Sequence, residues 1–169
     1  VENFTAHDAG SLMLGTYEVT VEGSGAALGA PVQFLASNNP PRMRRSDLED
    51  IVPPDVEGDT HRVLWDLTDQ DADAIHVQVH VASDPAQPRT SVAVGPPEGF
   101  FVGSSLPASV TLTTSFEFSL NRPELWNITT PHVLLSLVDG TFVGTCPACT
   151  FEPLGPRRFV TMGEIEPVA

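Results

Sequence analysis

The chain has 169 residues, 41% of them hydrophobic, and its 22 acidic residues against eight basic ones give a net charge of −14. This length suits one domain with a full-sized core, and the composition excludes wholesale disorder. A body this acidic repels phosphate, so we expect no direct nucleic-acid binding. No run approaches the roughly 20 apolar residues of a membrane-spanning helix, so we also expect no membrane span.

Alternating apolar and polar residues predict a half-buried strand over 15–23, with Tyr17, Val19 and Val21 on the inner face. The same reasoning, together with turn residues between the segments, predicts further strands along the chain. These strand candidates are 31–36, 62–67, 90–94 and 158–165.

A long polar excursion is predicted over 38–59. Within it, Ser46 and Glu49 have the spacing of a capping box, which predicts a short helical turn over 46–51. Excursions of this length are more often functional than idle. Three of the chain's eight bases fall in this segment, and they are either neutralised by nearby acids or form a contact patch for an acidic partner or a second copy. These bases are Arg42, Arg44 and Arg45.

Three aspartates alternate along the segment 66–74, at Asp69, Asp71 and Asp73. The spacing matches the opening of an EF-hand loop, in which oxygens at the first, third and fifth positions bind calcium. Ala74 stands where that loop needs its turn glycine, and His80 stands where it needs its glutamate. The trio is therefore a weak calcium candidate, and the alternative is a solvated acidic turn.

Two clear alternating segments follow. In 74–82, valines and Ile75 should face the core while His76, Gln78 and His80 face outward. The second segment, 109–120, predicts one long antiparallel strand. Trp126 follows in a turn-rich connection, where it either caps the end of the sandwich or is an exposed partner anchor.

Asp139-Gly140 is a strong signal for a two-residue type I′ turn, which predicts a hairpin over 132–146. The register set by that turn places Cys146 opposite Val133, on the core face. The only other cysteine, Cys149, lies beyond the break that Pro147 makes.

The Cys-Pro-Ala-Cys spacing is shared by redox dithiols, half-sites for zinc and tight structural disulfides. A redox pair normally begins a helix, and Pro153 and Gly155 leave no room for one. A zinc site needs four ligands, and this pair supplies two. We therefore expect a disulfide between Cys146 and Cys149, or two reduced thiols, with a structural role.

These patterns together predict an all-β chain: one antiparallel β-sandwich domain over 1–169, jelly-roll or immunoglobulin-like, with about eight or nine strands and minimal helix. No nucleophile elbow, dinucleotide loop or phosphate loop occurs in the sequence, so we expect no enzyme and no cofactor.

The features favour a non-catalytic structural or binding module of an outer surface or assembled shell, specifically a virion structural protein such as a capsid, decoration or spike domain. Its expected partners are copies of itself or other shell proteins, with a host surface or glycan as a further option, and its expected location is extracellular or on the virion. The alternative is a secreted carbohydrate-binding or adhesion β-sandwich with structural calcium.

Overall fold

The structure is a computed structural model of the whole chain, and it divides into two compact units, residues 1–39 and residues 40–169. The prediction of a single domain over 1–169 stays a prediction. The backbone is described for residues 15–19, 22–23, 26–27, 30, 32–36, 38–51 and 60–165, and side chains for residues 30, 38–43 and 60–165.

Short antiparallel pairs make up the described part of the first unit. β1 (Gly15–Val19) pairs with β4 (Val32–Ala36), and β2 (Glu22–Gly23) pairs with β3 (Ala26–Ala27). The strands predicted over 15–23 and 31–36 correspond to β1 and β4, but β1 ends at Val19, four residues before the predicted end. The faces on which Tyr17, Val19 and Val21 were placed lie outside the described residues.

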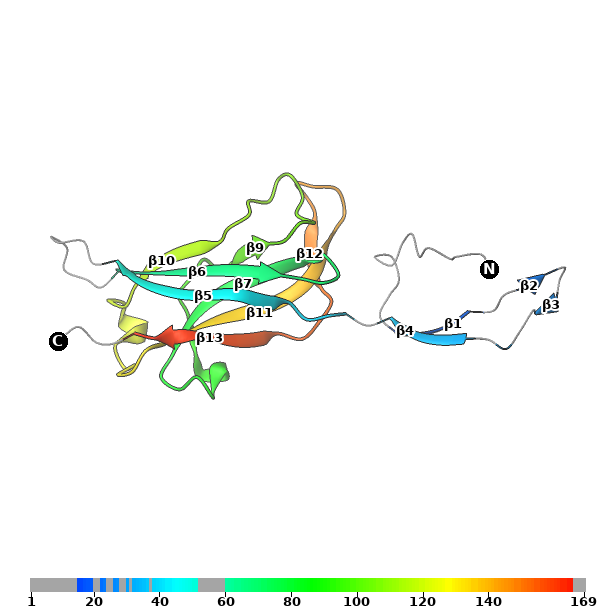
Figure 1. The fold of residues 1–169 in the computed structure, drawn as a ribbon. Helices are drawn as coiled ribbons and strands as arrows, with labels where there is room; N and C mark the ends of the chain where they lie inside the picture. The colour runs from blue at the N-terminus through cyan, green and yellow to red at the C-terminus, as the bar shows by residue number, and fades with distance from the viewer. Residues whose placement is uncertain are drawn as a thin grey trace. The chain divides into compact units, whose positions relative to one another are not determined.

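The second unit is an antiparallel β-sandwich (Figure 1). One sheet has the order β10-β6-β5. The other has β11 and β7 at its centre, with β12 and β13 on the outer edge of β11, and β8 and β9 on the outer edge of β7. The strands are β5 (Arg42–Ile51), β6 (Thr60–Thr68), β7 (Ala74–Ala82), β8 (Val92–Ala93), β9 (Phe100–Val102), β10 (Ser115–Ser119), β11 (His132–Val143), β12 (Thr150–Pro153) and β13 (Arg158–Glu164).

The core lies between the two sheets and follows the alternation of the sequence. Val63, Trp65 and Leu67 of β6 are buried on one side, and the odd-numbered residues of β7 with Val133, Leu135 and Leu137 of β11 are buried on the other. The prediction of a strand over 74–82 is confirmed, because β7 has these bounds and its four inward residues are fully buried. Helical structure in the described residues is limited to two 3₁₀ turns, η2 (Pro88–Thr90) and η3 (Pro123–Leu125).

His76, Gln78 and His80 lie on the outer face of the larger sheet, as predicted, but other parts of the chain partly cover this face. His80 is 7% exposed, packs edge-on against Phe159, and shares a hydrogen bond with the Ser91 hydroxyl at 3.0 Å. His76 shares one with the Glu98 carbonyl at 2.9 Å. Burial is the main cause that lowers the pKa of both histidines.

The strand predicted over 109–120 is shorter in the structure, where β10 begins at Ser115. The preceding residues instead link the two sheets. Trp65 donates its backbone N–H to the Thr114 carbonyl and its indole N–H to the Thr113 carbonyl, both at 2.9 Å. Thr113 in turn donates to the Phe101 carbonyl on the larger sheet at 3.1 Å. Tertiary hydrogen bonds to two partners therefore override the local alternation.

The helical turn predicted over 46–51 was wrong, and so was the reading of the whole of 38–59 as an excursion. Residues 42–51 form β5, which pairs antiparallel with β6 along its whole length. A capping box is a local signal of about 1 kcal/mol, and a ladder along a whole neighbouring strand outweighs it. The remainder of that range, 52–59, lies outside the described residues.

The two-residue turn at Asp139-Gly140 was also wrong. β11 continues through both residues, which pair with Ile75 and Ala74 of β7. Gly140 is needed for close approach instead of for a turn, because an added Cβ would lie 2.3 Å from the Glu152 carbonyl oxygen. The chain reverses seven residues later than predicted, between β11 and β12, where Val143 pairs with Thr150.

Candidate functional site

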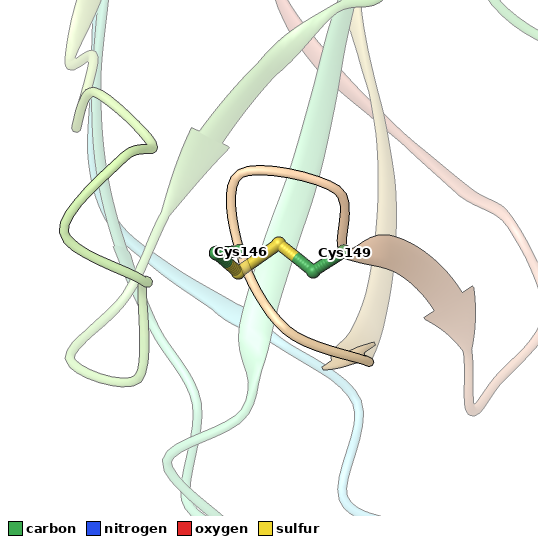
Figure 2. The surroundings of a disulfide bond; sticks show 2 residues. All are labelled: Cys146 and Cys149. Carbon is green, nitrogen blue, oxygen red and sulfur yellow. A yellow bond between two sulfur atoms is a disulfide. The ribbon is translucent and has the colours of Figure 1, made fainter.

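The reversal between β11 and β12 is closed by a disulfide. Figure 2 shows Cys146 and Cys149 joined across the loop, with their Cα atoms 4.5 Å apart. Cys146 is half-buried in this loop and does not pair with Val133, so its predicted place on the core face was wrong. The pair fastens a hairpin end, and no cysteine in the described residues is free.

The acidic turn, Asp69 to Asp73, connects β6 to β7. Asp69 accepts the backbone N–H of Asp71 at 2.8 Å, and Ala72 has a positive φ of 62° that bends the turn back. The three carboxylates of Asp69, Asp71 and Asp73 converge, with one oxygen of each within 4.8 Å of the others. The structure thus brings together the three side chains that the sequence spacing singled out.

A fourth carboxylate, Asp139, lies beneath this turn and is only 2% exposed. Burial raises the pKa of Asp73 from 3.8 to about 6, and the charges of Asp69, Asp71 and Asp139 raise it in the same direction. Burial also raises the pKa of Asp69, against the lowering effect of backbone hydrogen bonds. Four carboxylates therefore gather at this end of the sandwich, and the charges of the other three act in the same direction as burial on the pKa of Asp73.

The acidic turn borders a cavity of about 540 Å³, which we call the acidic pocket. Trp65, Val102 and Leu112 supply apolar walls, while Asp69 and Asp73 supply carboxylates. The Oδ2 atom of Asp69 is buried and has no hydrogen-bond partner within the described part of the chain. Two oxygens that bind one calcium ion at about 2.4 Å lie at most about 5 Å apart, so the trio has a spacing that suits calcium.

The predicted arginine patch is described at one of its three positions. Arg42 is exposed at the start of β5, while the side chains of Arg44 and Arg45 lie outside the described residues. The pairing of β5 with β6 shifts between Met43 and Arg45, which makes Arg44 the extra residue of a β-bulge.

Arg42 borders a second cavity of about 550 Å³, which we call the basic pocket. Arg158, at the start of β13, is on its other side, and Met43, Leu137 and Val160 supply an apolar lining. None of the described residues that line this pocket is acidic. Neither guanidinium has a hydrogen bond or ion pair with any residue that the structure describes.

Trp126 is 69% exposed, which makes the capping interpretation wrong. It directly follows η3, whose Leu125 is 3% exposed and anchors the turn in the core. Arg122 fastens the same turn by donating to the Val94 carbonyl at 2.9 Å. The indole is thus held in solvent by an ordered turn.

Arg42 and Trp126 do not share a site. Arg42 pairs with Thr68 at the end of β6, whereas the turn with Trp126 follows β10, whose Ser119 pairs with Thr60 at the start of β6. The nine residues of β6 separate the two ends by about 27 Å at the usual strand rise. Figure 1 shows β5 and β6 running side by side over this length.

Sequence reasoning missed Asp139 and Arg158. Asp139 was read as a turn residue because glycine follows it, and no local pattern distinguishes the two roles. Arg158 lies 116 positions from Arg42, and only the approach of β13 to β5 brings them to one pocket.

No protein-family model, curated protein or solved structure matches this chain. Among the described residues, no helix is long and apolar enough to cross a membrane.

Proposed function

We propose that this chain is a non-catalytic structural and binding module of an outer surface or assembled shell, and specifically a virion structural protein such as a capsid, decoration or spike domain. Its partners on this proposal are copies of itself or other shell proteins, at an extracellular or virion surface.

The exposure of Trp126 is the observation that carries the proposal. A tryptophan side chain that is 69% exposed leaves a large apolar surface in water, and tryptophan is enriched among residues that dominate protein interfaces. The anchored turn holds the indole in place, so binding would lose little conformational entropy. An exposed, pre-ordered aromatic of this kind suits a contact with another protein.

The described arrangement also supports repeated contacts between copies. Two unlike features, the exposed turn and the basic pocket, lie at opposite ends of β6. Contacts between unlike surfaces are head-to-tail, and they generate rings or open chains of subunits. Shells and surface arrays are built from such repeated contacts.

Light scattering after size-exclusion chromatography tests the proposal. We expect the chain to form concentration-dependent oligomers, and Trp126→Ser to weaken them. Leu112→Ser is the matched control, because Leu112 is also an exposed large apolar residue, at 54%, but lies beside the acidic pocket. A wild-type chain that stays monomeric at high concentration would contradict the proposal.

A second candidate is a secreted carbohydrate-binding or adhesion β-sandwich with structural calcium. The convergence of Asp69, Asp71 and Asp73 within 4.8 Å favours it, and Trp126 would then stack on a sugar. A rise in melting temperature with calcium that chelator reverses is the expected result. Equal melting temperatures in calcium and in chelator would exclude the calcium part of this candidate.

A further inference from the structure

The basic pocket contains unpaired cations in a strongly acidic chain. Arg42 and Arg158 line it, and neither guanidinium has an ion pair or hydrogen bond with a residue that the structure describes. The chain has 22 acids and eight bases, so an arginine without a carboxylate partner among the described residues is unexpected. Two of them on one cavity create a local positive site that suits an anionic group.

The lining of the pocket narrows the kind of group that would fit. Met43, Leu137 and Val160 make its remaining walls largely apolar. A guanidinium pair above an apolar floor accommodates a carboxylate next to an apolar or aromatic side chain. Arginine binds carboxylates through two parallel hydrogen bonds and also stacks on aromatic rings.

The opposite end of the same sandwich presents this combination. Glu124 and Trp126 lie on and directly after η3, both are exposed, and Glu124 has no ion pair or hydrogen bond within the described part of the chain. Glu164, at the far end of β13, adds a second exposed carboxylate there, since its partner His132 follows the same loop. One end therefore presents an exposed carboxylate beside an exposed indole. At the other end, where the carboxylates of the acidic pocket also lie, the basic pocket offers two arginines above an apolar floor.

We infer that the turn Pro123–Trp126 of one copy docks into the basic pocket of the next, placing the Glu124 carboxylate between Arg42 and Arg158 and the Trp126 ring on the apolar lining. The inference rests on the proposed self-assembly and specifies its contact as head-to-tail. The two complementary surfaces lie on one chain about 27 Å apart along β6, so they cannot meet within one copy.

Mixing of two variants tests the inference. Arg42→Gln with Arg158→Gln removes the pocket's charges, and Glu124→Gln with Trp126→Ser removes the docking turn. In analytical ultracentrifugation we expect each variant alone to associate at least about tenfold more weakly than the wild type. An equimolar mixture should form dimers and stop there, because each pair has one intact pocket and one intact turn.

The control is Arg89→Gln, which removes one positive charge from an exposed position on η2 that lines neither pocket. It should assemble like the wild type, and thermal melting of every variant checks that it is folded. Assembly of the pocket variant at wild-type strength, or a mixture that stays monomeric, would overturn the inference while leaving the proposed function standing. A monomeric wild type would instead overturn the proposed function, and the docking between copies with it.

Discussion

The acidic pocket and the basic pocket have nearly the same volume and lie at the same end of the sandwich, yet they treat charge in opposite ways. In the acidic pocket, burial and then the charges of the neighbouring carboxylates raise the pKa of Asp73 to about 6. In the basic pocket Arg42 and Arg158 stand apart from any described acid, over an apolar floor. A bound cation would reduce the repulsion between the carboxylates of the acidic pocket. A bound anionic group would pair with the two arginines of the basic pocket.

The largest expected effect on stability comes from a substitution in the apolar floor of the basic pocket, and not from one at its charged rim. Leu137 lines that pocket and is 1% exposed, so Leu137→Ala leaves a cavity in the core. We expect a loss of about 2–5 kcal/mol in the free energy of unfolding, measured by urea denaturation. A loss below about 1 kcal/mol would mean that the core collapses to fill the space.

Calcium should act on the acidic pocket alone. A bound ion stabilises the folded state by about 3 kcal/mol when its concentration is about 100 times the dissociation constant, and calorimetry can measure the shift in melting temperature. Asp71→Asn should abolish the shift, and Glu117→Gln, which removes an exposed acid from β10, should retain it. An equal shift in Asp71→Asn would place the ion elsewhere.

The pH dependence of stability follows from the sign of the Asp73 shift. The carboxyl binds its proton more tightly in the folded chain than in the unfolded chain, where its pKa is near 3.8. Its stabilising contribution is therefore full below pH 3.8 and is lost as the pH rises through about 6. Asp73→Asn should remove this loss and, without calcium, raise the unfolding free energy at neutral pH by about 1 kcal/mol, after allowing for screening by water.

Denaturation of Asp73→Asn and the wild type across this pH range measures the difference. The two curves should converge below pH 3.8, separate as the pH rises from 3.8 to about 6, and stay apart by a constant amount above that. Histidine effects are common to both proteins and cancel in the comparison. A constant difference at every pH would show that the ionisation of Asp73 is not the cause.

The smallest effect is expected at the rim of the basic pocket. Arg42 and Arg158 are exposed and unpaired within the described chain, so replacing either with glutamine should change the unfolding free energy of the monomer by less than about 0.5 kcal/mol. Urea denaturation at a concentration where the protein is monomeric measures this. A larger loss would indicate that the arginines stabilise the monomer rather than a contact.

The sequence predicts features that depend on residues close together along the chain, and it misses features that depend on residues far apart. β6 and β7 were found because alternation is local and both bury one face in the core. The acidic trio was found because its spacing along five residues already brings the carboxylates together. Both wrong turn predictions came from local signals that pairing with a remote strand overrides. Pairing with β6 keeps residues 46–51 in an extended strand, and pairing with β7 does the same for Asp139 and Gly140.

A glycine can allow a tight turn or a close approach of another strand, and the sequence alone does not distinguish these two roles. A glycine after aspartate fits a tight turn, but Gly140 is there so that the backbone of β12 can approach. The basic pocket could not be predicted for a similar reason, because Arg42 and Arg158 come from strands that meet only in the folded sandwich. Arg42 was singled out because it lies in a cluster of three arginines along the chain. Arg158, the other arginine of the pocket, was not.

The short segment around Thr113 has a mechanical consequence. Its hydrogen bonds reach Trp65 on one sheet and Phe101 on the other, so it is tied to both layers at once. A force that slides one sheet past the other loads these bonds together instead of breaking them one after another. A sandwich with such a tie resists sliding of its two sheets as a single body.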